Sequence, residues 1–138
     1  MRSKFDFYSD AGHGWLKVTR RELHQLGIHK LISGSSYAAG INVYLEEDAD
    51  AQAFINAWEK KTGKEWSSSA NVKDHASDRS RIRGYDGYVP MDDAALLALE
   101  KAAAALQEAY PHQKRKIGTA WMDDIQKWAA TLPQPARA

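Results

Sequence analysis

The sequence predicts an α+β domain, because segments with the period of a β-strand come early in the chain and segments with the period of an amphipathic helix come later. Aromatic and β-branched residues form the strand-like segments at 5–18 and 41–45. Apolar residues at spacings of three and four form the helical segments after residue 50. We therefore expect a single domain over residues 1–138, with a small antiparallel or mixed sheet packed by about four helices.

A short β-hairpin is predicted at the N-terminus. Phe5 and Phe7 precede the turn-forming sequence DAGHG at 10–14, and Trp15 and Leu16 follow it. Strand-forming residues on both sides of a glycine-containing turn are typical of a hairpin.

A helix is predicted at 20–26. Thr19 and Glu22 have the spacing of a capping box, in which each side chain accepts a hydrogen bond from the backbone N–H of the other residue. Gly27 then supplies the left-handed conformation that ends a helix. A helix of about two turns needs tertiary support, so its apolar residues should face the core.

A third strand and a second, longer helix complete a hairpin-helix-strand-helix unit over 1–63. Apolar residues alternate with Asn42, Tyr44 and Glu46, so Tyr44 is expected on the solvent face of this strand. The helix that follows should end at Gly63, which again suits the left-handed conformation.

Residues 64–90 are predicted to form an irregular connection, because they are polar and have no sustained period. A connection of this length is expected to be functional or mobile, or to hide a short strand around Val72. Its last part, 81–90, is expected to return as a strand or a structured turn.

Two C-terminal helices are predicted in 91–132. Asp92 or Asp93 caps the first, which Pro111 ends, and Thr119 caps the second. The predicted core consists of Phe5, Phe7, Trp15, Leu16, Val18, Leu23, Leu26, Val43, Leu45, Phe54, Ile55, Trp58, Leu96, Leu99, Leu106, Ile125 and Trp128.

Composition and charge argue against several classes of protein. No apolar run approaches the roughly 18 residues that span a bilayer, and Asp6 and Asp10 interrupt any signal-like segment. A chain without cysteine has no disulfides and no thiolate nucleophile, which suits a reducing cytoplasm. With 19 basic and 18 acidic residues, no global charge attracts nucleic acid.

His13 lies between two glycines in the predicted turn and is the first candidate functional residue. A catalytic base needs a partner, and only Asp10 is near His13 in sequence. The favoured interpretation is structural, a turn histidine that is exposed or binds Asp10. The remaining histidines lack the spacing of a metal site, so no metal or other cofactor is predicted.

An acidic cluster lies between the third strand and the following helix, and it consists of Glu46, Glu47, Asp48 and Asp50. Clustered carboxylates can hold a hard cation, but the glycine and the ligand spacing of a calcium-binding loop are absent. The favoured interpretation is that the cluster ends the strand and caps the helix. Its acidic surface is then available to a basic partner.

A basic and aromatic stretch follows at 79–88. Its candidate contact residues are Arg79, Arg81, Arg83, Tyr85 and Tyr88. Such residues can bind phosphates and stack on bases. The structural alternative places the arginines on the solvent side of a strand around Ile82, or pairs them with Asp74 and Asp78.

Several stretches of the chain resemble one uncharacterised protein family. FYSDAGHGWLKV, RELHQLGI and VYLEEDADAQAF carry the resemblance within Lys4 to Ile55, and SRIRGYDGY at Ser80 to Tyr88 is similar to a later motif of that family. Its members are small proteins of bacteriophages, plasmids and other mobile elements. The resemblance implies a genomic setting and brings no catalytic residues with it.

These observations favour a non-enzymatic, protein-binding accessory of a phage or other mobile element. The most concrete form of this hypothesis is an inhibitor that occludes a surface of a host defence complex such as a CRISPR effector. The first alternative is a nucleic-acid-binding accessory protein that uses the Arg79, Arg81 and Arg83 region, and the second is a histidine-dependent hydrolase. The expected partner is a host protein or protein complex, and no binding to a membrane is expected. The sequence does not indicate an oligomeric state.

Overall fold

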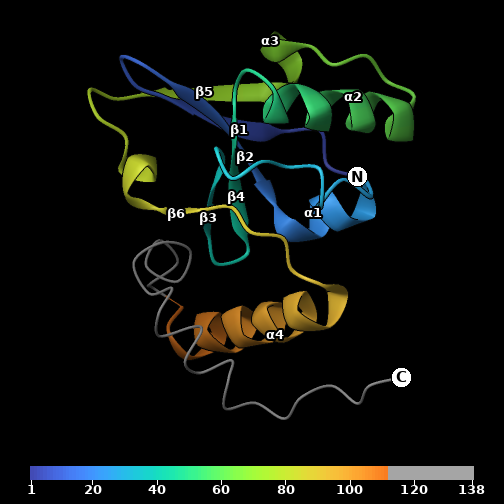
Figure 1. Cartoon of the computed structure of the whole chain (residues 1–138), viewed down its shortest axis with the longest axis vertical. Coiled ribbons are helices and arrows are strands. Elements are labelled where there is room, and N and C mark those ends of the chain that lie inside the picture. Colours follow the sequence, from blue (N-terminus) through green and yellow to red (C-terminus); the bar gives the residue numbers. More distant parts are fainter. Residues whose placement is uncertain (112–138) are drawn as a thin grey trace. The chain divides into compact units, whose positions relative to one another are not determined.

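The computed structural model describes residues 1–111 of the chain (Figure 1). These residues belong to two compact units. Unit 1 consists of Met1–Ala38 and Asn42–Pro90, and unit 2 consists, among the described residues, of Ala39–Ile41 and 91–111. The described residues contain a six-stranded mixed sheet and four α-helices, which confirms the α+β class.

The sheet has the strand order β5-β1-β2-β4-β3-β6. Its strands are β1 (Phe5–Ser9), β2 (Gly14–Thr19), β3 (Tyr37–Ala39), β4 (Asn42–Glu46), β5 (Val72–Ala76) and β6 (Asp86–Gly87). The predicted hairpin is β1 and β2, which pair antiparallel, and β2 pairs antiparallel with β4. β5 pairs parallel with β1, so the sheet is mixed.

The helices start and stop largely where the local sequence predicts. They are α1 (Arg20–Gln25), α2 (Asp50–Thr62), α3 (Ser68–Asn71), α4 (Asp93–Ala109) and the 3-10 helix η1 (Arg81–Gly84). Thr19 and Glu22 form the predicted capping box. Gly27 and Gly63, at φ of 69° and 71°, follow α1 and α2 in the left-handed conformation, and the Asp92 side chain caps α4.

One face of the sheet in unit 1 packs against α1 and α2. The strands contribute side chains such as Leu16, Val43 and Leu45 to this core, and α2 contributes Phe54 and Trp58, all of them at most 1% exposed. Burial of large apolar side chains of this kind is the main favourable term in the stability of a domain.

The second face of the sheet is also partly covered, which corrects one expectation. Tyr44 is expected at the solvent face of its strand, but it is 4% exposed, and Trp15 on the same face is 3% exposed. The Tyr85 ring lies 5.2 Å from the Tyr44 ring, and the Arg83 guanidinium lies 5.7 Å from the Trp15 ring. The chain after β5 therefore folds back over this face.

Residues 64–90 contain more regular structure than an irregular connection. α3, β5, η1 and β6 all lie in this range, and β5 confirms the short strand around Val72. The stretch around Ile82 is a 3-10 helix and not a strand, because Ile82 is buried while the chain turns at Ser80, whose hydroxyl accepts a hydrogen bond from the Ile82 N–H.

Unit 2 is built around one face of α4. Leu99, Ala102 and Ala103 are buried on this face and pack with Ile41 and Met91. The predicted last helix from Thr119, with its core residues Ile125 and Trp128, lies outside the described residues. No helix within residues 1–111 combines the length and the apolar character needed to cross a membrane.

Candidate functional site

The turn of the N-terminal hairpin is organised by the Asp10 side chain. Its Oδ1 atom accepts hydrogen bonds from the backbone N–H groups of Gly12 and His13, at 3.2 and 3.1 Å. The backbone of Asp10 donates to the carbonyl of His13 at 2.9 Å. His13 is therefore an exposed residue at the tip of a closed turn, as the structural interpretation predicted.

The same carboxylate binds the chain that follows β5. The Arg83 side chain donates to both carboxylate oxygens, from Nε to Oδ2 at 2.6 Å and from Nη2 to Oδ1 at 2.8 Å. The Ser80 backbone N–H donates to Oδ2 at 3.1 Å. Only 1% of the Asp10 side chain is exposed. The Arg83 guanidinium, helped by the Ser80 and turn amides, holds the pKa of Asp10 far below its usual range.

The acidic turn before α2 lies against the hairpin turn. The Glu47 backbone N–H donates to the carbonyl of Gly14 at 3.1 Å, and a Cβ atom on Gly14 would lie only 2.7 Å from the Glu47 carboxylate. Glu46 closes the acidic turn, because its carboxylate accepts from the backbone N–H groups of Asp48 and Ala49. Glu47 and Asp48 are exposed.

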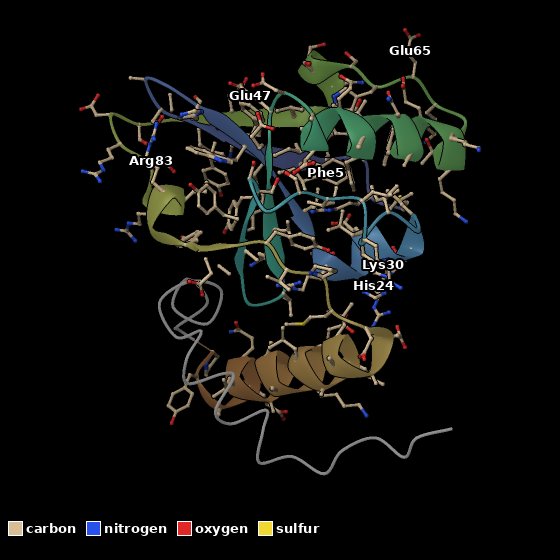
Figure 2. The ribbon with its side chains drawn as sticks, in the orientation of Figure 1. Phe5, His24, Lys30, Glu47, Glu65 and Arg83 are labelled. Atoms are coloured by element: carbon tan, nitrogen blue, oxygen red, sulfur yellow. The ribbon has the colours of Figure 1, made fainter. Side chains whose placement is uncertain are left out.

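Three segments therefore meet at one end of the sheet. We call them together the sheet-end platform: the hairpin turn at 10–14, the acidic turn at 46–48 and the arginine segment at 79–83. Figure 2 shows Arg83 on the arginine segment and Glu47 on the acidic turn. Arg79 and Arg81 are exposed beside Ser80, which binds Asp10.

Asp50 belongs to a buried network and not to the surface. Its Oδ2 atom accepts from the Ser33 backbone N–H at 3.1 Å, the Ser33 hydroxyl at 2.7 Å and the Ser36 hydroxyl at 2.6 Å. The Ser36 oxygen in turn accepts from the backbone N–H of Glu46 at 2.9 Å. The predicted helix-capping role of the acidic cluster is only partly seen, since Ala49 precedes α2 and makes no side-chain cap.

The two tyrosines of the basic and aromatic stretch also serve the fold. Tyr88 is 4% exposed, donates its hydroxyl hydrogen to the carbonyl of His29, and lies under the Arg20 guanidinium at 5.2 Å. Tyr85 is half-buried against Tyr44. The predicted contact residues that remain exposed are His13, Glu47, Asp48, Arg79, Arg81 and Arg83.

Sequence reasoning missed the role of Asp10 as the common ligand of two distant segments. Arg83 follows Asp10 by 73 residues, whereas the sequence suggested either a solvent-facing strand or pairing with Asp74 and Asp78 for the arginines. The local signal at Asp10 was a turn-forming aspartate, which predicts its bonds to Gly12 and His13 but not the bond to Arg83.

The geometry around His13 differs from that of a catalytic dyad. The Asp10 carboxylate accepts from the backbone N–H groups of His13 and Ser80 and from the Arg83 side chain, and none of its hydrogen bonds within residues 1–111 goes to the His13 ring. In the described part of the chain, no group of three or more histidine, aspartate or glutamate side chains is arranged to hold a metal ion. No family model, curated protein or solved structure matches the chain.

His24 stacks on His29, and Figure 2 shows His24 near Lys30 and apart from the platform. The rings of His24 and His29 are 3.8 Å apart at 12°. Nδ1 of His29 is buried and has no hydrogen-bond partner in the described chain. Burial, together with the positive charge of His24 and Lys30, lowers the pKa of His29 below its ordinary value of 6.5.

We expect the free energy of unfolding to fall as the pH drops below the ordinary histidine value of 6.5. In that interval the unfolded chain binds a proton at His29 and the folded chain does not, so acid favours unfolding until the lowered pKa is reached. Urea titrations at about pH 7.5 and about pH 5.5 measure this difference. His29→Gln should reduce it, whereas His13→Gln, at the exposed turn, should leave it in place. An unchanged pH dependence in His29→Gln would show that the stacked pair does not titrate in this way.

Proposed function

We propose that this protein is a non-enzymatic binding protein that uses the sheet-end platform to occlude a surface of a host protein or protein complex. The observation that carries the proposal is the convergence of two distant segments on the buried carboxylate of Asp10. Turns fixed in this way lose little conformational entropy on association, so their contacts contribute more fully to affinity.

The side chains of the platform suit recognition of a protein. The Arg83 guanidinium is held over the buried Trp15 ring, and arginine is among the residues enriched where protein interfaces gain most of their affinity. Exposed charges of both signs lie on the platform around Arg83, with Glu47 on the acidic turn and Arg81 on the arginine segment itself. Opposite charges at fixed positions discriminate between partners and set the orientation of the complex.

The resemblance to proteins of mobile elements supports a target inside the bacterial host. A defence complex such as a CRISPR effector offers a phosphate-binding groove lined with arginine and lysine. Glu47 and Asp48 are exposed carboxylates that can compete for those cations. We therefore propose inhibition by surface occlusion, in the cytoplasm of the host.

Replacing Glu47 and Asp48 with lysine should weaken binding to the partner by at least about tenfold, because it reverses two exposed charges of the platform. The partner is captured from a lysate of the bacterial host with the tagged full chain, purified, and titrated against each variant by calorimetry. Glu65→Lys, which reverses an exposed charge away from the platform (Figure 2), serves as the control.

The outcome decides whether the platform is the contact surface. Loss of affinity in the platform variant but not in Glu65→Lys supports the proposal. Equal affinity of wild type and platform variant would remove the acidic turn from the interface. Failure to retain any host protein above the level seen with an unrelated tagged protein would remove the binding function itself.

A further inference from the structure

Two rows of side chains cross the sheet on the face that α1 and α2 do not cover. Successive side chains of a strand point to opposite faces, so residues in register on neighbouring strands share a face. The strand pairing gives one row as Lys73, Asp6, Lys17 and Tyr44, and the next row as His75, Tyr8, Trp15 and Glu46. The rows thus place aromatic rings beside cationic side chains.

Two partly exposed aromatic rings of this face lie on β1 and β5. Trp15 and Tyr44 are buried under the chain that follows β5, but Tyr8 and His75 are only half-buried. Their rings are stacked, with centroids 4.8 Å apart and planes at 17°. The His75 Nε2 atom lies 2.9 Å from the Asp6 carboxylate, which holds the imidazole in place. The result is a fixed aromatic surface at the edge of the sheet.

Basic side chains flank this aromatic pair on both sides. Lys17 and Lys73 belong to the neighbouring row, and the two rows are about 7 Å apart along the strands. At the other end of β1, the bond from Ser80 to Asp10 places the exposed Arg79 and Arg81 next to the hairpin turn. Asp74 lies on the opposite face by strand alternation, so Asp6 is the one carboxylate in the row of the lysines.

A hollow opens at the start of β1 and β5, beside Lys73. Its volume is about 350 Å³, and its polar lining includes Lys4, Asp6, Ser69 and Lys73. The Lys4 ammonium donates to the carbonyl of Ala70 at 2.6 Å on one side of this space. The hollow has room for an unstacked base next to the row of lysines.

We propose that this sheet face binds single-stranded nucleic acid. Bases stack on the Tyr8 and His75 pair, and phosphates contact Lys17 and Lys73 on one side and the arginine segment on the other. Aromatic side chains on a sheet read bases only when these are not paired, which favours a single strand over a duplex. This site goes beyond the proposed protein-binding function and uses different residues from the acidic turn.

Fluorescence anisotropy of a labelled oligodeoxythymidylate of about 12 nucleotides tests the proposal with the full chain. We expect binding at low salt that weakens as salt rises, with a slope of log K against log salt of about −2 for about three phosphate contacts. Tyr8→Ala should weaken binding by about tenfold or more, while Tyr8→Phe, which keeps the ring, should bind like the wild type. Circular dichroism establishes that each variant folds.

The lysines have a matched control on α2. Lys17→Gln with Lys73→Gln should reduce the salt slope by about 1.4, whereas Lys60→Gln with Lys61→Gln, which are exposed on α2, should leave it unchanged. Glu47→Lys should keep oligonucleotide binding, so failure of this site and failure of the platform are distinguishable. No binding at low salt, or equal losses in the two lysine pairs, overturns the proposal. If the wild type binds no oligonucleotide and Tyr8→Ala loses a protein partner, this face binds protein and not nucleic acid.

Discussion

Asp50→Ala is expected to lower the free energy of unfolding by about 3 kcal/mol. Its carboxylate accepts from the Ser33 backbone, the Ser33 hydroxyl and the Ser36 hydroxyl, and Ser36 is completely buried. Alanine leaves the Ser36 hydroxyl without this acceptor in a place that water does not reach, so the cost is that of a buried unpaired polar group. Equilibrium unfolding in guanidinium chloride measures the change.

Asp48→Ala is the matched control for this prediction, because it removes a carboxylate that is exposed two residues away. We expect it to change the free energy of unfolding by no more than about 0.5 kcal/mol. Ser36→Ala should fall between the two, since it removes one donor to Asp50 and leaves the Glu46 backbone N–H without its acceptor. Similar losses in Asp48→Ala and Asp50→Ala would contradict the assignment of Asp50 as the centre of the network.

The ends of the elements could be predicted because short-range chemistry determines them. Thr19 and Glu22 are three residues apart, so their capping box depends on one turn of backbone. Gly27 and Gly63 adopt a conformation that glycine reaches without steric cost. Each of these features depends on only a few consecutive residues, so the local sequence pattern is sufficient to predict it.

The coverage of the second sheet face could not be predicted in this way. Alternation of polar and apolar residues placed Tyr44 on the solvent side, which is correct for the direction of its side chain but not for its exposure. Tyr85, which covers it, follows by 41 residues and belongs to a segment without a period of its own. The parallel pairing of β5 with β1 is equally non-local, since it joins Phe5 to Val72.

In the acidic cluster of the candidate site, too, contacts from distant parts of the chain could not be predicted. Glu46, Glu47 and Asp50 look equivalent in sequence, but the first closes a turn, the second is exposed and the third is buried. Their different roles come from Ser33 and Ser36, which reach Asp50 from a separate loop. Sequence reasoning therefore located the acidic surface but assigned too many carboxylates to it.

Asp10→Asn is expected to release the arginine segment from the hairpin turn and to increase its rate of cleavage by trypsin by at least about tenfold. The carboxylate accepts two hydrogen bonds from Arg83, and an amide replaces one acceptor with an NH₂ group that faces the guanidinium. Trypsin cleaves after arginine, and Arg79 and Arg81 are exposed, so opening of the segment is what limits cleavage there. Mass spectrometry of the fragments gives the site and the rate.

Asp78→Asn provides the comparison, because it makes the same chemical change on an exposed aspartate next to Arg79. It should leave the rate of cleavage close to that of the wild type. Since the platform depends on Asp10, Asp10→Asn should also weaken binding to the protein partner, although Asp10 is too buried to touch that partner. If trypsin cleaves Asp10→Asn no faster than Asp78→Asn, other contacts hold the arginine segment, such as those of Ile82 and Tyr85. The platform then does not require the ion pair of Asp10 and Arg83.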